Sequence, residues 1–508
     1  MSSAAESKSE SKRGEGHDEL YVATYYLQCL AHASYVVAHG GFAVVIDPRR
    51  DPDVYLADLE SKGLRLKATL LTHIHADFVA GNSEITERAN VAVMLGANAG
   101  ASYPHLPVTE GDMVTLSEKY AIKALPTPGH TPGCVTWLLV DRTEGDRPLR
   151  AFTGDTLFVG NVGRPDLLGS VGFSADQMAR TLFKTLHTKL MTLPDDVIVH
   201  PAHGAGSPCG KSLGSELSST IGKEKATNEA LQFKDETAFV EYITTGQPEA
   251  PQYFLPVVKM NKMGAGKVEE FVSAVPALEA EAFAAQRERR HMGAEEIVVL
   301  DTREADDYAA GHVVGSVNFP VGLNRGEKLE SFEGNFAIWV GTLVSPSAVL
   351  LLVAPEGKEQ ESILRLARIG YHNVLGYLAG GMTAWKAAGL HIGHTTRHAI
   401  PDQAALAALV AKPGVQVLDV RTEGEFNCPR NGHIRGAINI PLNVLPSRLG
   451  ELDKDKHYAV YCSGGYRSAI AASYLLQEGI GSGDLHGGYY NILAVARELT
   501  TGTPATSA

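Results

Sequence analysis

Two segments in the second half of the chain repeat one another, and this repeat restricts the possible folds more than any other feature. The sequence VVLDTREADDYAAGHVVGSVNFP at 298–320 matches VLDVRTEGEFNCPRNGHIRGAINIP at 417–441, and YLAGGMTAW at 377–385 matches DLHGGYYNI at 484–492. Each copy alternates strand-like apolar runs with a helical pattern. Strands that alternate with helices predict two successive α/β domains with parallel sheets.

The region from Tyr21 to Phe233 has a different character. It opens with strand-like runs that Gly and Pro interrupt, and it ends with the strand DVIVHPAH. We therefore expect a multi-domain α/β chain. Its expected parts are a disordered tail (1–20), a first domain (21–233), a domain tail and linker (234–292), and two repeats (293–392 and 402–499).

Metal-ligating residue types cluster in the first domain, each close to an expected strand end and a Gly- or Pro-rich loop. Because strand ends meet at one edge of a sheet sandwich, these side chains are expected to form a metal site. They are His73, His75 and Asp77 in THIHAD, His130 in PTPGHTPG, Asp155 in FTGDTLF and His203 in HPAHG.

Residue 78 limits what this metal site can do. Many two-metal hydrolases carry His-x-His-x-Asp-His here, whereas this chain has Phe78 in place of the last His. Phenylalanine offers no lone pair, so we expect a single ion. A single Fe(II) ion held by imidazole and carboxylate donors keeps coordination positions open for other ligands. Zinc stays an alternative because ligand type alone does not exclude it.

The segments THIHAD, PTPGHTPGCVTW, FTGDTLFVGNVGRPDL and HPAH resemble the metallo-β-lactamase superfamily, and within it the persulfide dioxygenases, relatives of glyoxalase II. The resemblance implies an αββα sandwich over about residues 21–233. It also implies one Fe(II) per N-terminal domain, held by His73, His130 and Asp155. His75, Asp77 and His203 would then orient the ligands rather than bind the iron.

Three further residues bear on the substrate. The resemblance places Arg164 near a thiol substrate, where it would hold a carboxylate or phosphate, although an ordinary salt bridge is the alternative. Cys209 follows His203 closely and is a candidate for sulfur exchange. His200 stands where glutathione-using relatives commonly have Tyr, so the carrier thiol need not be glutathione, and coenzyme A, cysteine or another small thiol stays open.

The second repeat contains the loop CSGGYR, from Cys462 to Arg467, between a strand and a helix. Its glycines let the backbone curl so that N–H groups, the helix dipole and Arg467 favour a thiolate at Cys462. The pattern resembles the rhodanese family of sulfurtransferases, which implies three-layer α/β domains. Phosphatases also use a Cys-loop-Arg pattern, but Arg467 is the fifth residue after Cys462 rather than the sixth.

The first repeat lacks this nucleophile. Ala354 or Pro355 stands at the position of the Cys, and Glu356 and Glu359 replace the positive field. We expect an inactive rhodanese-like domain that acts as a spacer or docking unit.

Composition excludes some classes of function. The net charge of −13 argues against a general nucleic-acid binder. Five cysteines are too few for a secreted disulfide framework, which favours a cytoplasmic protein. We find no apolar run long enough to span a membrane, and the polar first 20 residues do not resemble a signal peptide.

These features predict a persulfide dioxygenase with sulfurtransferase activity. Its partners would be a small-molecule thiol persulfide, O2, sulfite and thiosulfate, with no nucleic acid and no membrane. A homo-oligomer is possible. One alternative is a zinc thioester hydrolase of the glyoxalase II kind fused to a sulfurtransferase. Another is a non-enzymatic persulfide carrier or sensor that uses Cys462 and Cys209 as relay thiols.

Overall fold

The computed structural model describes residues 18–167, 172–210, 213–247, 249–289, 296–322 and 336–501. Residues 1–17 of the expected tail therefore lie outside the described part. The chain forms two compact units, residues 1–270 with 367–370, and residues 271–366 with 371–508. Within the described ranges, no helix is both long enough and apolar enough to cross a lipid bilayer.

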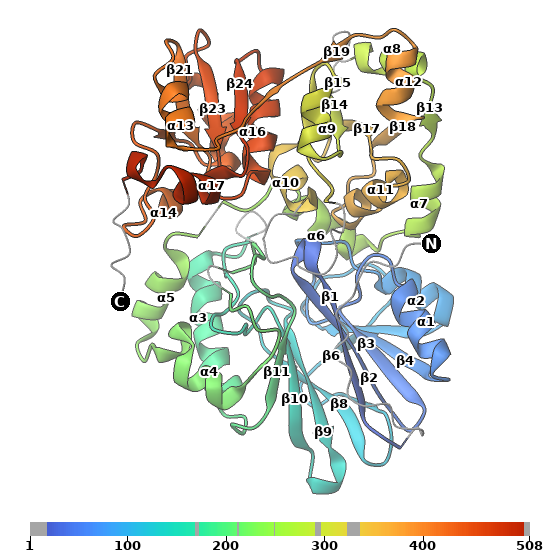
Figure 1. The fold of residues 1–508 in the computed structure, drawn as a ribbon. Helices are drawn as coiled ribbons and strands as arrows, with labels where there is room; N and C mark the ends of the chain where they lie inside the picture. The colour runs from blue at the N-terminus through green and yellow to red at the C-terminus, as the bar shows by residue number, and fades with distance from the viewer. Residues whose placement is uncertain are drawn as a thin grey trace. The chain divides into compact units, whose positions relative to one another are not determined.

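The first unit is built on two six-stranded sheets (Figure 1). One sheet has the order β1 (Tyr21–Leu27), β2 (His32–His39), β3 (Phe42–Ile46), β4 (Arg65–Leu70), β5 (Ala92–Gly96) and β6 (Leu106–Val108). The other has the order β12 (Ser219–Thr220), β11 (Ile198–Pro201), β10 (Arg147–Gly154), β9 (Val135–Asp141), β8 (Tyr120–Pro126) and β7 (Met113–Thr115).

Alternating side chains of β2 bury both faces of the first sheet. Tyr35 and Val37 pack into a core that includes Trp137 of the second sheet. Val36 points the other way and packs with Tyr55 of a covering helix. Because both faces are covered, the middle of the strand, from Tyr35 to Ala38, is apolar on successive residues instead of alternating with polar ones.

Helices cover the outer faces of both sheets. Figure 1 shows α1 and α2 outside the first sheet and α3 and α4 outside the second. The layer order helix, sheet, sheet, helix confirms the expected αββα sandwich. The helices of this unit are α1 (Asp53–Ser61), α2 (Asn82–Ala89), α3 (Ala175–Thr185), α4 (Ile221–Thr227), α5 (Glu236–Thr244) and α6 (Phe254–Met263), followed by α7 (Val268–Ala274), which continues into the second unit.

The second unit contains two five-stranded parallel sheets, one for each sequence repeat. The first has the order β13 (Ala277–Leu278), β18 (Val374–Leu378), β17 (Val349–Val353), β14 (Ile297–Asp301) and β16 (Ser316–Asn318). The second has the order β20 (Thr396–His398), β24 (Ser482–Leu485), β23 (His457–Tyr461), β21 (Val415–Asp419) and β22 (Ile438–Asn439). A small antiparallel pair joins β15 (His312–Val313) and β19 (Ile392–Gly393).

Helices accompany each sheet of the second unit. Those of the first repeat are α8 (Ala280–Glu288), α9 (Ala305–Ala310), α10 (Phe336–Leu343), α11 (Glu359–Arg368) and α12 (Gly381–Ala387). Those of the second are α13 (Gln403–Val410), α14 (Glu423–Phe426), α15 (Leu445–Arg448), α16 (Tyr466–Gln477) and α17 (Gly488–Val495). The first sheet starts upstream of residue 293, because β13 pairs with β18 from the region expected to be a linker.

The two repeats share hydrogen bonds as well as sequence. In each copy an Arg donates to the Asp two residues before it and to the carbonyl of the Gly in the Gly-His turn, which fastens the first strand to that turn. These residues are Arg303, Asp301 and Gly311 in the first repeat, and Arg421, Asp419 and Gly432 in the second.

Candidate functional site

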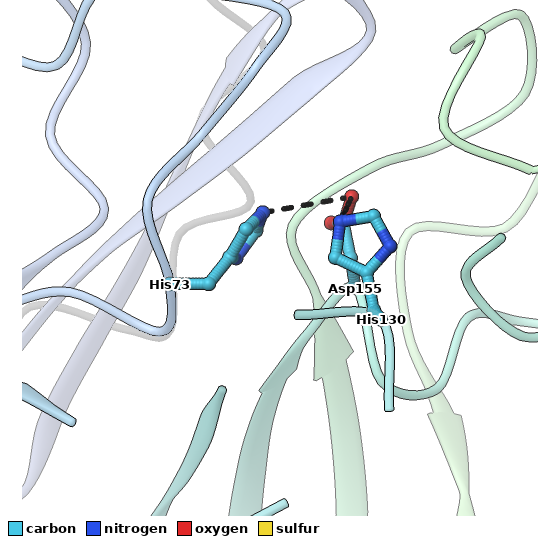
Figure 2. Close-up of side chains that lie close together, drawn as sticks. All are labelled: His73, His130 and Asp155. Atoms are coloured by element: carbon cyan, nitrogen blue, oxygen red, sulfur yellow. Dashed lines mark ion pairs between the residues drawn. The ribbon is translucent and has the colours of Figure 1, made fainter. Parts of the chain in front are cut away.

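The three residues expected to hold the metal converge from separate strand ends of the first unit. His73 follows β4, His130 follows β8, and Asp155 follows β10 directly. Figure 2 shows their side chains pointing toward one another. His73 Nε2 lies 3.8 Å from Asp155 Oδ2, and His130 Nε2 lies 3.5 Å from the same oxygen. All three are buried, and one ligand atom from each falls within 4.8 Å of the others.

Neighbouring groups fix the orientation of both imidazoles. The hydroxyl of Thr72 lies 2.9 Å from His73 Nδ1. His130 Nδ1 donates to the backbone carbonyl of Arg164 at 2.8 Å. Both rings therefore present Nε2 to Asp155, which is the way that outer partners usually orient metal-binding histidines.

The electrostatics of the cluster suit a cation. Burial holds the pKa of His73 well below its usual value, and the nearby His75 and His130 lower it further. Burial also lowers the pKa of His130, although Asp155 opposes the shift. Neutral rings keep a lone pair available for a metal. Among the described residues no hydrogen-bond donor is assigned to either buried oxygen of Asp155, and a bound cation would satisfy them.

Asp47 organises this site, although no motif in the sequence indicated its role. Its carboxylate accepts from the backbone N–H of Thr72 at 2.8 Å and from the Thr72 hydroxyl at 2.7 Å. The same carboxylate lies 3.1 Å from His75 Nε2. Asp47 follows β3, which neighbours β4, so only the strand order of the sheet brings it to the metal motif.

A second group of potential ligands lies beside the first. It contains His75, Asp77 and His203, all buried, with ligand atoms within 4.8 Å of one another. His203 Nε2 is 3.3 Å from Asp77 Oδ2 and 3.5 Å from Asp155 Oδ1. Burial raises the pKa of Asp77, although His203 and His75 oppose the shift. The sequence suggested that Phe78 leaves a second metal site incomplete. That argument is too strong, because three potential ligands of such a site still lie together.

Phe78 packs tightly within this region. Its ring centroid lies 4.0 Å from that of His32 and 4.4 Å from that of His75, and the side chain has no exposed surface. His32 was not predicted from the sequence. Its backbone pairs with His203, and burial holds the pKa of its fully buried ring well below the usual value. Phe78 thus fills space between two imidazoles instead of adding a donor.

Gly163 packs against two candidate metal ligands, Asp155 and His130, so adding a side chain here should weaken metal binding. A Cβ at this position would fall 1.9 Å from the carbonyl oxygen of Asp155 and 3.1 Å from His130 Nδ1. Gly163→Ala must therefore displace both ligands. We expect its metal affinity to fall by about 10- to 100-fold, the usual effect of disturbing the outer partners of a metal site. Metal titration of the apoprotein measures the change.

The matched control is Gly266→Ala in the same unit. A Cβ at Gly266 would meet no heavy atom within 4 Å, so its metal affinity should equal that of the wild type. Equal affinities for the two variants would contradict the placement of the metal beside Gly163.

Arg164 and Cys209 both reach this region, but the structure gives them different surroundings from those expected. The guanidinium of Arg164 is buried and donates to both oxygens of Asp166, at 2.8 and 2.7 Å. It therefore forms a buried salt bridge, while its backbone carbonyl holds His130. Cys209 is buried, and its sulfur lies within 4.8 Å of ligand atoms of Asp155 and His203.

The environment of Cys209 keeps its sulfur protonated. Burial raises the pKa of this thiol well above its usual value, and the carboxylates of Asp77 and Asp155 raise it further. A neutral thiol is a poor nucleophile. Sulfur exchange at Cys209 therefore stays a prediction. It requires a positive charge near the sulfur that favours the thiolate.

His200 does not face the metal group. Its ring stacks on Phe152 with centroids 5.0 Å apart and contacts the edge of Tyr35. Tyr35 and Phe152 belong to the core between the two sheets. The residue at position 200 therefore affects packing, and it gives no information on which thiol the protein uses.

The Cys462 loop of the second unit forms the expected cradle. The backbone N–H of Gly465 donates to Cys462 Sγ at 3.1 Å, and the hydroxyl of Ser468 lies 3.6 Å from the same sulfur. The loop ends at α16, whose first turn adds further N–H groups. Gly488 must lack a side chain, because a Cβ there would lie 2.7 Å from the carbonyl oxygen of Cys462.

Glu425, which the sequence did not single out, holds Arg467 beside this loop. Arg467 donates to both Glu425 oxygens, at 2.8 and 2.7 Å, and to the hydroxyl of Ser463 at 2.9 Å. Burial raises the pKa of Glu425, but the hydrogen bonds and charge of Arg467 outweigh this effect and lower it to about 2. The guanidinium is therefore fixed in place, and the ion pair reduces the field that it exerts on the sulfur.

No cradle like that around Cys462 is present in the described residues of the first repeat. Ala354 follows β17 at the position equivalent to Cys462, and Glu359 begins α11 where the second repeat has Arg467. Glu359 would repel a sulfur anion.

Comparison with known proteins agrees with this architecture. A model described as the metallo-beta-lactamase superfamily matches residues 27–203, and a rhodanese-like domain model matches residues 285–388 and 402–494. The probable metallo-hydrolase YqgX of Bacillus subtilis is 30% identical over 180 residues, which cover 79% of that protein and 32% of this chain. The chain belongs to the metallo-beta-lactamase superfamily. It also carries the two rhodanese-like domains that the internal repeat predicted.

Two other members of the superfamily extend this comparison. The mitochondrial persulfide dioxygenase ETHE1 of Homo sapiens is 33% identical over 162 residues, or 32% of this chain. The chain spans 58% of the length of that relative. A solved metallo-beta-lactamase from Staphylococcus aureus has 29% identity and a TM-score of 0.60, covering 71% of this chain and 99% of its own. These likenesses agree with the metal-binding cluster in the first unit.

Proposed function

We propose that the protein is an iron-dependent persulfide dioxygenase coupled to a sulfurtransferase. The observation that carries the proposal is the buried set of His73, His130 and Asp155, in which both rings are oriented toward one carboxylate. Two imidazoles and one carboxylate are the donors of non-haem Fe(II) oxygenases. The similarity to persulfide dioxygenases supports the same assignment.

The first reaction converts a thiol persulfide, dioxygen and water into the free thiol and sulfite. In balanced form, RSSH and O2 with H2O give RSH and H2SO3. Iron held by His73, His130 and Asp155 would supply the redox chemistry that lets dioxygen react with sulfur. Asp47, through Thr72, and the carbonyl of Arg164 hold the two rings in place.

The second reaction takes place at Cys462. Its thiolate attacks the outer sulfur of a second persulfide, so that the S–S bond of the substrate breaks and RS⁻ leaves with a proton. The backbone N–H of Gly465 and the hydroxyl of Ser468 lie beside the sulfur of Cys462 and stabilise its negative charge. Sulfite then attacks the outer sulfur, forming thiosulfate and restoring the thiolate.

Metal content and oxygen uptake together test this proposal. Protein purified without oxygen and loaded with ferrous iron should bind about one iron per chain, as a single facial triad requires. It should consume O2 when glutathione persulfide, coenzyme A persulfide or cysteine persulfide is added, and release sulfite. Zinc-loaded protein serves as the control and should consume no O2, because Zn²⁺ has no redox chemistry. Turnover with zinc, or no O2 uptake with iron, would refute the assignment.

One observation favours a different activity. His75, Asp77 and His203 form a second donor set next to the first, and paired ions are typical of hydrolytic sites. A zinc thioester hydrolase would use both sets. Two zinc ions per chain and hydrolysis of an acylated thiol without oxygen would support that activity instead.

A further inference from the structure

We propose that the inactive rhodanese-like repeat is a buttress that positions the Cys462 loop of the active repeat. This inference rests on the proposed role of Cys462 and adds a function for the first repeat. It concerns the second unit alone, because both repeats belong to that unit.

The helix that follows the Cys462 loop lies between the two repeats. On one side α16 packs against β23 and β24 of its own sheet, and on the other side against β16, the edge strand of the first repeat. Most of its residues are buried, which is unusual for a helix at the surface of an α/β domain. The first repeat therefore covers the face of α16 that would otherwise contact solvent.

The sequence of α16 fits this double packing. A run of small side chains lets neighbouring backbones approach closely. The equivalent helix of the first repeat, α11, has the sequence EQESILRLAR, in which charged and large side chains replace this run of small ones. The small buried residues of α16 are Ser468, Ala469, Ala471, Ala472 and Ser473.

Two hydrogen bonds fasten α16 to the first repeat. The hydroxyl of Tyr466 donates to the carbonyl of Pro320 at 2.8 Å. Further along the helix, the backbone N–H of Asn318 donates to the hydroxyl of Ser473 at 2.9 Å, and this bond is buried. Tyr466 is the first residue of α16 and belongs to the Cys462 loop, so its anchor acts on the loop directly.

A charged contact ties the same end of α16 to the first repeat. Arg397 pairs with Asp306 of the first repeat at 2.5 Å and with Asp484 of the second at 3.0 Å. A Cβ on Gly465 would lie 3.8 Å from Arg397 Nη2, so this guanidinium borders the loop. Asp306 of the first repeat thus holds Arg397 beside the start of α16, while Pro320 and Asn318 bind the helix itself.

The position of α16 matters because it sets the environment of Cys462. The Gly465 N–H lies directly before the helix and donates to Cys462 Sγ. If the first turn shifts, this bond and the helix dipole both act less favourably on a thiolate. The first repeat thus supports the reactivity of the loop without contributing a reacting atom.

Tyr466→Phe in the full-length protein tests this inference, because it removes only the hydroxyl that bonds to Pro320. We expect the rate at which iodoacetamide alkylates Cys462 near neutral pH, followed by mass spectrometry of the Cys462 peptide, to fall about tenfold, because less of the sulfur is present as thiolate. The kcat of thiosulfate formation should fall about tenfold, with KM nearly unchanged. Ser473→Ala should shift both quantities in the same direction, and it provides an independent variant should Tyr466→Phe fold poorly.

Tyr474→Phe is the matched control. Tyr474 lies on the same helix and lines a small cavity with Val317 and Phe319 of the first repeat, but among the described residues no hydrogen bond of its hydroxyl joins the repeats. Its alkylation profile and kcat should match the wild type. The inference is overturned if both test variants behave as wild type, or if Tyr474→Phe causes the same loss.

Alkylation separates this inference from the proposed function. The reaction of Cys462 with iodoacetamide requires no sulfur substrate. If Tyr466→Phe slows alkylation of Cys462 but the wild-type protein makes no thiosulfate, the supporting role of the first repeat stands and the proposed sulfurtransferase activity is refuted.

Discussion

Asp155→Asn should abolish O2 uptake with a thiol persulfide and lower iron affinity by more than about 100-fold. Asp155 is the residue that both His73 and His130 face, at 3.8 and 3.5 Å, so its loss removes the anionic donor shared by the set. An amide oxygen is a much weaker ligand than a carboxylate. Iron content after gel filtration and steady-state O2 consumption measure the two effects.

The melting temperature of the metal-free protein shows whether Asp155→Asn loses only the metal or also the fold. In the part of the chain that the structure describes, no donor is assigned to either buried oxygen of Asp155, so the carboxylate destabilises the metal-free protein. The apo form of Asp155→Asn should therefore melt at the same temperature as the wild-type apo form, or higher. Cys462 should still transfer sulfur from thiosulfate to cyanide. A lower melting temperature of the apo variant would assign Asp155 a structural role instead.

Asp141→Asn is the control for this substitution. Asp141 is also buried, but its carboxylate accepts from the backbone N–H of Thr143 at 2.9 Å at the end of β9. Its replacement should leave iron content and O2 uptake unchanged. Loss of iron in both variants would indicate a general effect of removing a buried carboxylate.

Cys462→Ser should lower thiosulfate formation by at least about 10³-fold while O2 uptake and sulfite release continue. Serine keeps the shape of the loop, but its hydroxyl does not ionise under the influence of one N–H and a helix dipole. Sulfite should therefore accumulate. Ion chromatography of sulfite and thiosulfate in one reaction measures both products.

The control for this substitution is Cys428→Ser in the same repeat. Cys428 is partly exposed and lies in the segment before Gly432, outside the Cys462 loop. Its replacement should preserve both products. If Cys462→Ser also stopped O2 uptake, the division of labour between the two units would be wrong.

The internal repeat allowed much of the second unit to be predicted. Matching strand, turn and helix patterns at 298–320 and 417–441 specify two sheets of one kind, because hydrophobic periodicity and Gly-His turns are local properties of the chain. The absence of a thiol at Ala354 was equally visible. The start of the first sheet was not, because the two-residue strand β13 is defined only by its pairing with β18.

The candidate metal site, too, could be predicted from the sequence only in part. The sequence identified His73, His130 and Asp155 because each lies in a distinctive loop. For Arg164 it left open a substrate contact and an ordinary salt bridge, and the structure pairs the guanidinium with Asp166. Asp47 was missed, since its contact with Thr72 spans two neighbouring strands.

Local motifs were sufficient to predict the types of donor, the candidate nucleophile and its silent counterpart, because a motif within one loop specifies both backbone and chemistry. The partners that hold these groups are known from the folded chain: Asp47 for the candidate metal ligands, Glu425 for Arg467, and Pro320 for Tyr466. Such partners lie far apart along the chain. Their contacts depend on strand order and on how helices pack against sheets, which short sequence patterns do not encode.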